Sequence, residues 1–319
     1  MSANASHSPS GSSPRATNLA VVIPTYRRHA SVARLIQSLL RGSVQPHSIV
    51  VVNNDSSSDA HAQLASTLPP SVRLFHGKFG LNLSAARNLG WRSTSVPLIL
   101  FLDDDNVVAP DTIRLLSEHR FGPSAAAVAP VSLIAGTDKV FCAGTRRSMW
   151  TTRTWGRTSL PVDPRDTGLA STADMPNAFA ISRVALDMVA GFDSVSFPFH
   201  YSEADIFFRM RQIGYEPCRV LFTARVYHCT DTAHGIGTEY LRAYELGGAT
   251  RVSDLVAARV TFHRKYSRTT FQRFVACRVA IPAYCLLVTV ALLLDARSRS
   301  HVRVVARAMW HGLSTGARR

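Results

Sequence analysis

Short apolar runs alternate with amphipathic segments over the first 120 residues. Four β-branched runs predict strands, at Leu19–Ile23, Ile49–Val52, Val72–Phe75 and Leu98–Leu102. Between the first two runs, apolar residues such as Val32, Leu35 and Leu39 recur at helical spacing. This β-α-β-α order predicts a mostly parallel, doubly wound α/β sheet, whose carboxyl edge is where such sheets bind ligands.

The middle of the chain continues the alternation less regularly. Further strands are predicted at Ala125–Ile134, Ala178–Ile181 and Val220–Tyr227, and helices at Arg183–Ala190 and Glu203–Ile213. Each of these helices is followed by a glycine, a common residue just beyond a helix end. Residues 146–175 show no period, so we expect a long loop over the ligand face there.

The C-terminal region is helical and apolar. Residues 274–294 have Arg278 as their only charge, and 21 helical residues at ~1.5 Å each give about 31 Å, close to the ~30 Å hydrocarbon layer. This segment is predicted to be a single membrane span, a monotopic insertion or a buried helix of a soluble domain. Beyond it, Val302, Val305, Met309 and Leu313 share one face of a basic helix, which predicts a helix lying in the membrane interface.

The charge of the chain is concentrated in this same region. Of the net charge of +15, residues 264–319 contribute +10, from eleven Lys/Arg against Asp295. A basic and apolar tail favours an anionic membrane surface over nucleic acid as its partner. Five scattered cysteines without a CxxC pair indicate a reducing compartment and argue against a zinc cluster.

These patterns predict three parts of the chain. Residues 1–17 are Ser-rich and lack a hydrophobic run, which predicts a disordered leader and no secretory signal. Residues 18–240 form the α/β domain, and residues 241–319 form a helical extension with the hydrophobic segment 274–294 and the basic tail. We therefore expect the protein at the cytoplasmic face of the membrane.

Three adjacent carboxylates, Asp103, Asp104 and Asp105, follow the apolar run that ends at Leu102. Such neighbours repel one another unless a positive charge lies among them. Oxygen ligands favour Mg²⁺ or Mn²⁺, usually shared with nucleotide phosphates. The other interpretation is an acidic turn that caps the helix beginning near Pro110.

Five further polar residues are candidates for chemistry. Glu203 and Asp205 begin a predicted helix, on which Asp205 can pair with Arg209 and leave Glu203 to act as a base, unless both belong to a solvated helix start. Arg87 and Asn88 lie just upstream of the acidic cluster, where Arg87 can reach a diphosphate and Asn88 can orient the acidic loop. His228 ends an apolar strand and is either a structural histidine or a metal ligand.

The order of these motifs resembles that of family 2 glycosyltransferases of the GT-A fold. The similar stretches begin at Val21, Ile49, Ala85, Phe101, Ala190 and Ser202, with the sequences VVIPTYRR, IVVVNNDS, AARNLG, FLDDD, AGFD and SEADIFFR. The FLDDD stretch corresponds to the DxD motif. The C-terminal tail resembles the membrane-associated extension of rhamnosyltransferase-like members.

The resemblance implies an inverting, metal-dependent transfer of a sugar from a nucleotide diphosphate to an acceptor hydroxyl, on a glycan or lipid-linked acceptor. It implies Mn²⁺ or Mg²⁺ as the cofactor, held by Asp105 with Asp103 and His228. It places the nucleotide-sugar against Pro24, Thr25, Tyr26, Arg28, Asn53, Asp55, Arg87, Asn88, Asp103 and Asp104. The family usually has an acid at the position of Asn53, so the base contact is altered or moves to Asp55. The catalytic residues are Glu203 and Asp205, of which Glu203 is the preferred base.

Two other functions fit parts of the sequence. A degenerate nucleotide fold can serve as a scaffold for a non-catalytic membrane- or nucleic-acid-binding protein, which the basic tail favours. However, the body lacks the interleaved aromatic and basic residues of a nucleic-acid face, so we expect no nucleic-acid partner. Nucleotidyl transfer shares the acidic metal site but requires a Gly-rich phosphate loop that this sequence does not show.

Overall fold

The computed structural model describes residues 17–77, 80–122, 124–160, 169–229, 238–295 and 299–318. Apart from Thr17, the leader predicted at 1–17 lies outside these residues. The first part of the chain alternates strands and helices as predicted, in the order β1 (Leu19–Thr25), α1 (His29–Leu40), β2 (Ser48–Asn53), α2 (Ser58–Thr67), β3 (Val72–His76), α3 (Leu83–Arg92) and β4 (Leu98–Leu102).

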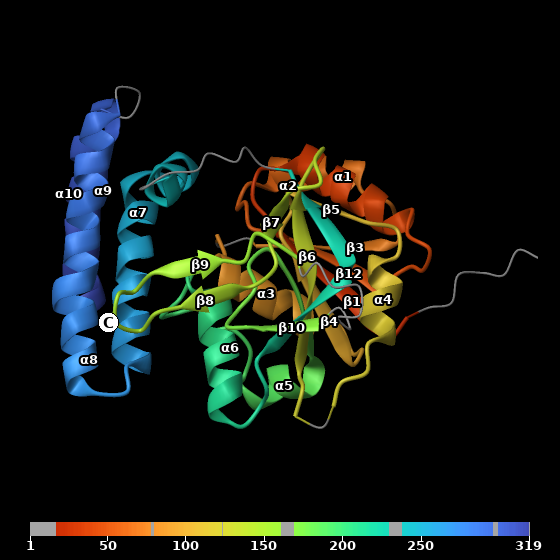
Figure 1. The fold of residues 1–319 in the computed structure, drawn as a ribbon. Coiled ribbons are helices and arrows are strands. Elements are labelled where there is room, and N and C mark those ends of the chain that lie inside the picture. Colours follow the sequence, from red (N-terminus) through yellow and green to blue (C-terminus); the bar gives the residue numbers. More distant parts are fainter. Residues whose placement is uncertain are drawn as a thin grey trace, which may run out of the picture.

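One large sheet forms the centre of the described chain (Figure 1). Its main path runs in the order β10-β12-β6-β11-β4-β1-β2-β3, and β4, β1, β2 and β3 are parallel to one another. Among the later strands, β11 is antiparallel to both of its neighbours. The order 4-1-2-3 brings the carboxyl ends of β1, β2 and β4 side by side, which confirms the predicted mostly parallel α/β sheet.

The remaining elements of this domain are β5 (Asn106–Val108), α4 (Thr112–Glu118), β6 (Ala127–Ile134), β7 (Val140–Cys142), β8 (Thr145–Arg147), β9 (Thr154–Gly156), β10 (Leu169–Thr172), β11 (Ala178–Ser182), α5 (Arg183–Met188), α6 (Ser202–Gln212) and β12 (Cys218–His228). All the strands and helices predicted for the middle of the chain are present, with ends shifted by a few residues. Strands β5 and β7 pair with β12 and β6 beside the main path of the sheet.

Helices cover both faces of the sheet because the strand residues alternate between two cores. Ala20 and Val22 of β1 pack in a core with α3, α5 and α6, whereas Val21 and Ile23 pack in a second core with α1, α2 and α4. Side chains of a strand point alternately to opposite faces, so an unbroken apolar run has both faces buried. The run from Leu19 is therefore a central strand.

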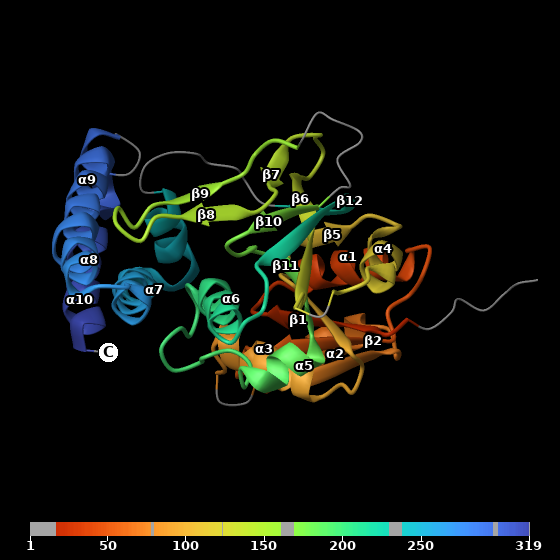
Figure 2. The same cartoon turned by 60° about the horizontal axis from the view of Figure 1, so that its bottom comes forward.

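The structure corrects the expectation of a long loop at 146–175. Within the described residues, β8 and β9 form an antiparallel hairpin and β10 joins the edge of the large sheet. The hairpin leans toward the C-terminal helices (Figure 2), where the Arg147 guanidinium lies 4.8 Å from the Tyr201 ring and Trp150 contacts Phe271. Residues 161–168 lie outside the described chain.

The C-terminal region consists of helices beside the sheet domain (Figures 1 and 2). They are α7 (Thr238–Tyr266), α8 (Thr270–Phe274), a π-helical turn (Val275–Ala280), α9 (Ile281–Leu294), a short 3-10 turn (Arg299–His301) and α10 (Val302–Arg318). Helix α7 is kinked at Gly247 and Gly248. The predicted domain boundary at residue 240 falls inside α7, and the division into domains stays a prediction.

The structure also corrects the predicted interfacial role of α10. Val302, Val305 and Met309 of its apolar face are buried against protein, in a core shared with α7 and α9. At Gly312, an added Cβ would lie 2.5 Å from the Ser253 carbonyl oxygen of α7, so the two helices touch backbone to backbone. The apolar face of α10 is therefore used for protein packing and does not face a bilayer.

A different apolar surface is exposed on the helix Thr270–Leu294. This segment is long and apolar enough to cross a membrane, by length and composition alone, and 22% of its most apolar window is buried. Ile281, Cys285, Val288 and Leu292 face the protein. The exposed side, which we call the outer apolar face, consists of Phe271, Phe274, Val279, Leu286, Leu287, Val290, Leu293 and Leu294.

Candidate active site

The polar loops after β1, β2 and β4 meet at one edge of the sheet. Thr25 pairs with Asn53 at the ends of β1 and β2, and Val22 of β1 pairs with Phe101 just before the acidic loop. Parallel strands end at the same edge, so this register brings Arg28, Asn53 and the loop after β4 together.

The acidic loop is bound to the loop after β1. Asp104 is buried and accepts hydrogen bonds from the Thr25 hydroxyl at 2.6 Å and from Arg28 Nη1 at 3.1 Å. The same Arg28 nitrogen lies 3.0 Å from Asp105 Oδ2. Arg28 therefore supplies part of the positive charge that three adjacent carboxylates require.

Asp105 faces His228, the last residue of β12. The Nε2 atom of His228 lies 3.5 Å from Asp105 Oδ1, and that buried oxygen accepts no hydrogen bond from the residues that the structure describes. Burial lowers the pKa of His228, although Asp105 acts in the opposite direction, so the imidazole is neutral at pH 7. A neutral imidazole and an unpaired carboxylate oxygen are both metal-ligand types, but the described residues hold no ready cluster of three or more His, Cys, Asp or Glu.

Arg87 connects the acidic loop with the start of α6. Its guanidinium is buried and donates to Asp103 Oδ1 at 3.0 Å, Glu203 Oε1 at 2.6 Å and the Ser202 hydroxyl at 2.9 Å. Asp103 and Glu203 are 100 residues apart in sequence, yet one cation holds both. Since these bonds all go to protein groups, the predicted contact of Arg87 with a diphosphate stays a prediction.

The two carboxylates on Arg87 have pKa values shifted in opposite directions. Burial raises the pKa of Asp103 to about 7, and its acidic neighbours add to this, while Arg87 opposes it. Burial also disfavours the charged form of Glu203, but the Arg87 guanidinium and hydrogen bonds outweigh burial and hold the pKa of Glu203 below its usual range. Glu203 is thus ionised at neutral pH, the form that a general base requires.

Asp205 has a different environment from Glu203. It is fully buried, and the predicted pair with Arg209 is present at 2.7 Å. Lys265 and the Tyr266 hydroxyl, both from α7, also donate to its carboxylate at 2.8 Å and 2.6 Å. Asp205 therefore links α6 to α7, and this role is structural. Lys265 and Tyr266 had no signal in the sequence, because they approach from 60 residues away.

Asn88 is bonded to the turn after α5 and not to the acidic loop, which corrects its predicted orienting role. Its side-chain amide donates to the Phe192 carbonyl and accepts from the Phe192 amide, at 2.8 Å and 2.9 Å. Gly191 has a φ of +74°, and a Cβ there would lie 2.5 Å from Asn88 Oδ1. The AGFD stretch thus provides a close turn that packs on α3.

The loop after β2 is organised around Asp55. Its carboxylate accepts from the Ser57 amide at 3.0 Å and from Arg27 Nε at 2.9 Å, which together hold its pKa below the usual range. Asn53 Oδ1 accepts from the Asp55 amide. Pro24 lies in β1 and Tyr26 is half exposed beside this loop. Arg27, which the sequence did not single out, is held here in a left-handed conformation with a φ of +58°.

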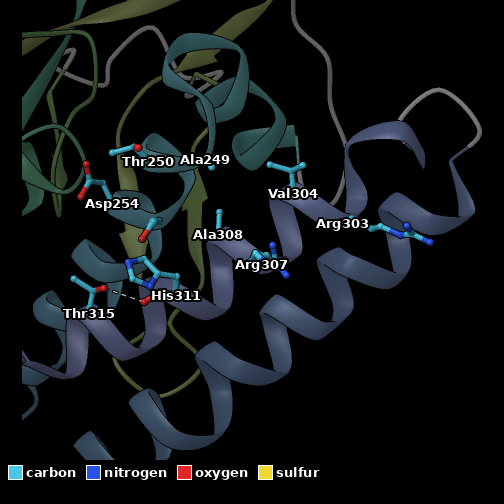
Figure 3. Close-up of a pocket in the computed structure, with 10 residues that line it drawn as sticks. Ala249, Thr250, Asp254, Arg303, Val304, Arg307, Ala308, His311 and Thr315 are labelled. Carbon is cyan, nitrogen blue, oxygen red and sulfur yellow. Dashed lines mark hydrogen bonds between the residues drawn. The ribbon is translucent and has the colours of Figure 1, made fainter.

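Two cavities lie outside the acidic loop. One, of about 800 Å³, lies between α7 and α10 (Figure 3), with Thr250 and Asp254 on one side and Arg307 and His311 on the other. None of its lining residues belongs to an element that carries a predicted site residue. The other, of about 680 Å³, lies between the β8–β9 hairpin, α7 and α9 and includes Tyr201, next to the start of α6.

Comparison with known proteins identifies the family of the chain. Residues 20–187 match the family described as Glycosyl transferase family 2, which is more than half of the chain. The chain belongs to glycosyl transferase family 2. The matched range includes the acidic loop, Arg87 and Asp55 but ends before Glu203, Asp205 and His228, so the roles of the latter three rest on the geometry described above.

Curated relatives of this family 2 member share only a segment with it. A validoxylamine A glucosyltransferase of Streptomyces hygroscopicus subsp. limoneus is 33% identical over 114 residues, which is 34% of this chain and 25% of the relative. An uncharacterized glycosyltransferase of Haemophilus influenzae is 26% identical over 93 residues, 29% of this chain and 31% of the relative. The matched segment thus spans about a quarter to a third of these relatives.

Solved structures show the fold of the family 2 chain. The mannosyltransferase PcManGT of Pyrobaculum calidifontis, in complex with GDP-Man and Mn²⁺, has a TM-score of 0.52 at 16% identity and covers 97% of this chain and 89% of its own. GalNAc-T7 with UDP, GalNAc and Mn²⁺ has a TM-score of 0.54 at 16% identity, covering 76% of this chain and 47% of its own. The expected GT-A fold is confirmed by these likenesses.

Proposed function

We propose that this protein transfers a sugar from a nucleotide diphosphate to an acceptor hydroxyl, with inversion at the anomeric carbon. The observation that carries the proposal is the Arg87 bridge, which holds an ionised carboxylate, Glu203, beside Asp103 of the acidic loop. Transfer by a single displacement needs a base for the acceptor and stabilisation of the leaving diphosphate. In this proposal Glu203 is the base, and a cation held at the acidic loop would stabilise the diphosphate.

Glu203 is the base in this proposal, and Asp205 is a positioning residue. The Glu203 side chain retains 18% exposure, whereas that of Asp205 has none and is saturated by Arg209, Lys265 and Tyr266. Glu203 accepts the proton of the acceptor hydroxyl as the oxygen attacks the sugar. Arg87 and the Ser202 hydroxyl fix the orientation of the Glu203 carboxylate, because Arg87 donates to Ser202 and Ser202 donates to the second carboxylate oxygen.

Asp105, in the loop after β4, and His228, at the end of β12, form a pair of possible ligands that fits a divalent cation. Asp105 Oδ1 has no hydrogen-bond partner in the described chain, and His228 next to it is neutral. Two protein ligands suit Mg²⁺ or Mn²⁺, which commonly complete their coordination with substrate phosphates and water. When bound, such a cation neutralises charge on the leaving diphosphate. Both solved relatives described above were determined with Mn²⁺, which supports this choice.

Nucleotide recognition is assigned to the loops after β1 and β2. Tyr26 is exposed for stacking, and Asp55 is held rigidly by Arg27 and Ser57. Thr25 and Arg28 fix Asp104, so these three residues shape the loop that lies next to the diphosphate. Pro24 lies in the buried strand β1, and Asn53 accepts from the Asp55 amide, so both support these loops from inside the protein, whereas Asn88 holds the turn after α5.

We assign membrane attachment to the outer apolar face and not to α10. One side of the helix Thr270–Leu294 packs on protein along its length, and its neighbour α10 exposes Arg303 and Arg307. Full insertion would carry those charges into the hydrocarbon layer, which is costly. A helix lying on the bilayer buries the outer apolar face alone, which favours monotopic attachment and a membrane-borne acceptor. The side of the membrane stays a prediction.

Binding of nucleotides tests the donor and metal parts of the proposal. We expect UDP, GDP or dTDP to bind the full chain in calorimetry with Mn²⁺, and to bind at least about tenfold more weakly with chelator, since a shared cation contributes several kcal/mol. Asp105→Ala should remove the metal dependence, whereas Asp111→Ala, at an exposed acid beyond this loop, should not. If the three nucleotides bind equally with and without metal, the cation part of the proposal is wrong.

A further inference from the structure

The cavity between the β8–β9 hairpin, α7 and α9 is lined by a residue next to the start of α6 and by a residue of the outer apolar face. At one end it is lined by Tyr201, which directly precedes Ser202 and Glu203. Pro176 lines the same end, and the next residue, Asn177, accepts a hydrogen bond from the Asp103 amide at 2.9 Å. The volume of about 680 Å³ is within the range of ligand-binding pockets.

The other end of the cavity is apolar and opens onto α9. Leu255, Tyr284 and Leu287 line it, and Leu287 is also 48% exposed as part of the outer apolar face. One side chain therefore belongs both to the cavity wall and to the surface that we assign to the membrane. An apolar chain bound against Leu287 therefore contacts that surface.

The middle of the cavity is basic. Three arginines line it, Arg147, Arg153 and Arg259, against one lining carboxylate, Glu239. Arg147 is paired with buried Asp174 at 2.6 Å and Arg259 with Glu239 at 2.9 Å, so these two are fixed in place. Arg153 is exposed, lies over the Trp155 ring, and forms no ion pair with a described residue. A guanidinium of this kind binds phosphate oxygens with two parallel hydrogen bonds.

His200 adds a polar atom without a partner. It lines the cavity, and its Nε2 is buried without a hydrogen-bond partner in the part of the chain that the structure describes. Burial lowers the pKa of His200 to about 3, with Arg251 and Arg259 contributing, so the ring is neutral. An unpaired buried nitrogen costs free energy unless a ligand or water satisfies it.

We infer that this cavity is the acceptor site, and that the acceptor is a hydroxyl-bearing group carried on a lipid-linked phosphate. Its phosphate lies among Arg147, Arg153 and Arg259, its apolar chain leaves over Leu287 onto the outer apolar face, and its reacting hydroxyl lies toward Glu203. The inference rests on the proposed transfer, for which it names the substrate class and the site. It also gives the β8–β9 hairpin a role as the outer wall of the acceptor site.

The test measures binding of three probes to the full chain in a non-ionic detergent: farnesyl phosphate, farnesol and inorganic phosphate. We expect farnesyl phosphate to bind at least about tenfold more tightly than either of the others. It alone has both a phosphate for the arginines and an apolar chain for the apolar lining residues. If farnesol binds as tightly as farnesyl phosphate, the arginines do not bind the phosphate and the inference is wrong. If inorganic phosphate binds as tightly, the site takes a free anion and the lipid part is wrong.

Two pairs of variants locate the binding. Arg153→Glu should weaken farnesyl phosphate about tenfold or more, whereas Arg157→Glu, an exposed arginine of the same segment outside the cavity, should have less than about a twofold effect. Leu287→Asp should weaken it similarly, whereas Leu294→Asp, on the same face but outside the cavity, should not. Equal effects within either pair would overturn the assignment to this cavity.

Nucleotide binding separates this inference from the proposed transfer. Arg153→Glu and Leu287→Asp should leave metal-dependent nucleotide affinity unchanged, since neither residue lies on the loops after β1, β2 or β4. If nucleotides bind but farnesyl phosphate does not, the acceptor site is wrong and the transfer stands. If farnesyl phosphate binds with the expected variant pattern while no nucleotide binds, the site is a phospholipid-type pocket and the proposed transfer fails.

Discussion

Asp103, Asp104 and Asp105 are neighbours in the chain but have three different partners. Asp103 bonds to Arg87, Asp104 to Thr25 and Arg28, and Asp105 lies near His228. The sequence predicts that three adjacent carboxylates need positive charge, because their repulsion is a local property. Which positively charged side chain lies against which carboxylate depends on the order of the strands in the sheet. The sequence analysis could not predict these pairs.

Glu203 and Asp205 also differ in whether their partners could be predicted from the local sequence. The pair of Asp205 with Arg209 was predictable, since residues four apart on a helix are neighbours. The bond of Glu203 to Arg87 joins residues 116 positions apart. That bond gives the two acids different environments, because it keeps Glu203 ionised at the acidic loop while Asp205 is enclosed by α7.

Glu203→Gln tests the assignment of the base. We expect the transfer rate to fall at least about a hundredfold, since a general base contributes ~10²–10⁴-fold, while metal-dependent nucleotide affinity stays within about twofold. Initial rates and calorimetry on the same preparation measure both quantities. Asp205→Asn is the comparison: it should lower the thermal unfolding midpoint because Lys265 and Arg209 lose their partner. Near-normal turnover of Glu203→Gln would assign the base elsewhere.

At the scale of elements, the sequence predicted the helices correctly but misassigned what one of them contacts. The apolar stripe Val302, Val305, Met309 is the same whether a helix faces a bilayer or another helix, since hydrophobic periodicity does not identify the partner. In the structure this stripe packs against protein. Gly312 and Gly316 were the overlooked signal, because two small residues four apart allow close approach of a second helix.

Gly312→Val tests the contact between α10 and α7. A Cβ at this position would lie 2.5 Å from the Ser253 carbonyl oxygen and 2.8 Å from Val256 Cβ, so the helices must separate. We expect a loss of about 1–3 kcal/mol in unfolding free energy, with faster amide exchange in α10. Ser314→Val is the matched control, because it places the same side chain on the exposed side of the same helix. A loss in Gly312→Val no larger than in Ser314→Val would contradict a close contact at Gly312, because valine has a higher helix propensity than glycine.

The elements of the middle region show a second limit of pattern reading. Residues 146–175 have no period, yet β8 and β9 pair there as a hairpin. Strands of three residues are too short for alternation to be visible. Contacts with distant residues hold this pair, because Arg147 lies over Tyr201 and Phe262 and Trp150 contacts Phe271. The predicted loop was wrong for this reason.

At the scale of the whole molecule, the proposed membrane attachment uses the exposed side of the apolar helix, whereas the apolar stripe of α10 in the basic tail packs on protein. Helices α8 and α9 lie beyond α7 as seen from the sheet domain (Figure 2), their exposed leucines and phenylalanines belong to the outer apolar face, and Leu287 of that face also lines the cavity beside α7. The composition of residues 264–319 predicts attraction to anionic lipid. Only the packing of α9 on α7 and α10 decides which side chains remain available for it.

Substitution of this face tests the attachment. Leu286→Asp combined with Leu293→Asp should lower binding of the full chain to vesicles with anionic lipid about tenfold or more, measured by sedimentation, because two exposed leucines lose their insertion and gain charge. Val195→Asp, at an apolar residue that is 83% exposed on the sheet domain, is the control. Complete release of the unaltered chain by 1 M salt would show that charge alone holds it, against a role for this face.

The sequence by itself determined what is local or periodic. Side-chain types at fixed spacing predicted the parallel strands β1 to β4, the acidic loop, the helix that bears Glu203 and Asp205, and the apolar segment at 274–294. They did not predict the short strands β5, β7, β8, β9 and β10. The ordered motifs also identified the family, because several short matches in one order are far more specific than each alone.

Tertiary structure decided every relation between distant residues. It placed Arg87 between Asp103 and Glu203, brought Lys265 to Asp205, turned the apolar stripe of α10 onto α7, and formed the cavity that joins Tyr201 to Leu287. The physical reason is that burial and ion pairing depend on which surfaces meet in space. A pattern along the chain indicates that a surface is apolar or charged, but only packing shows what covers it.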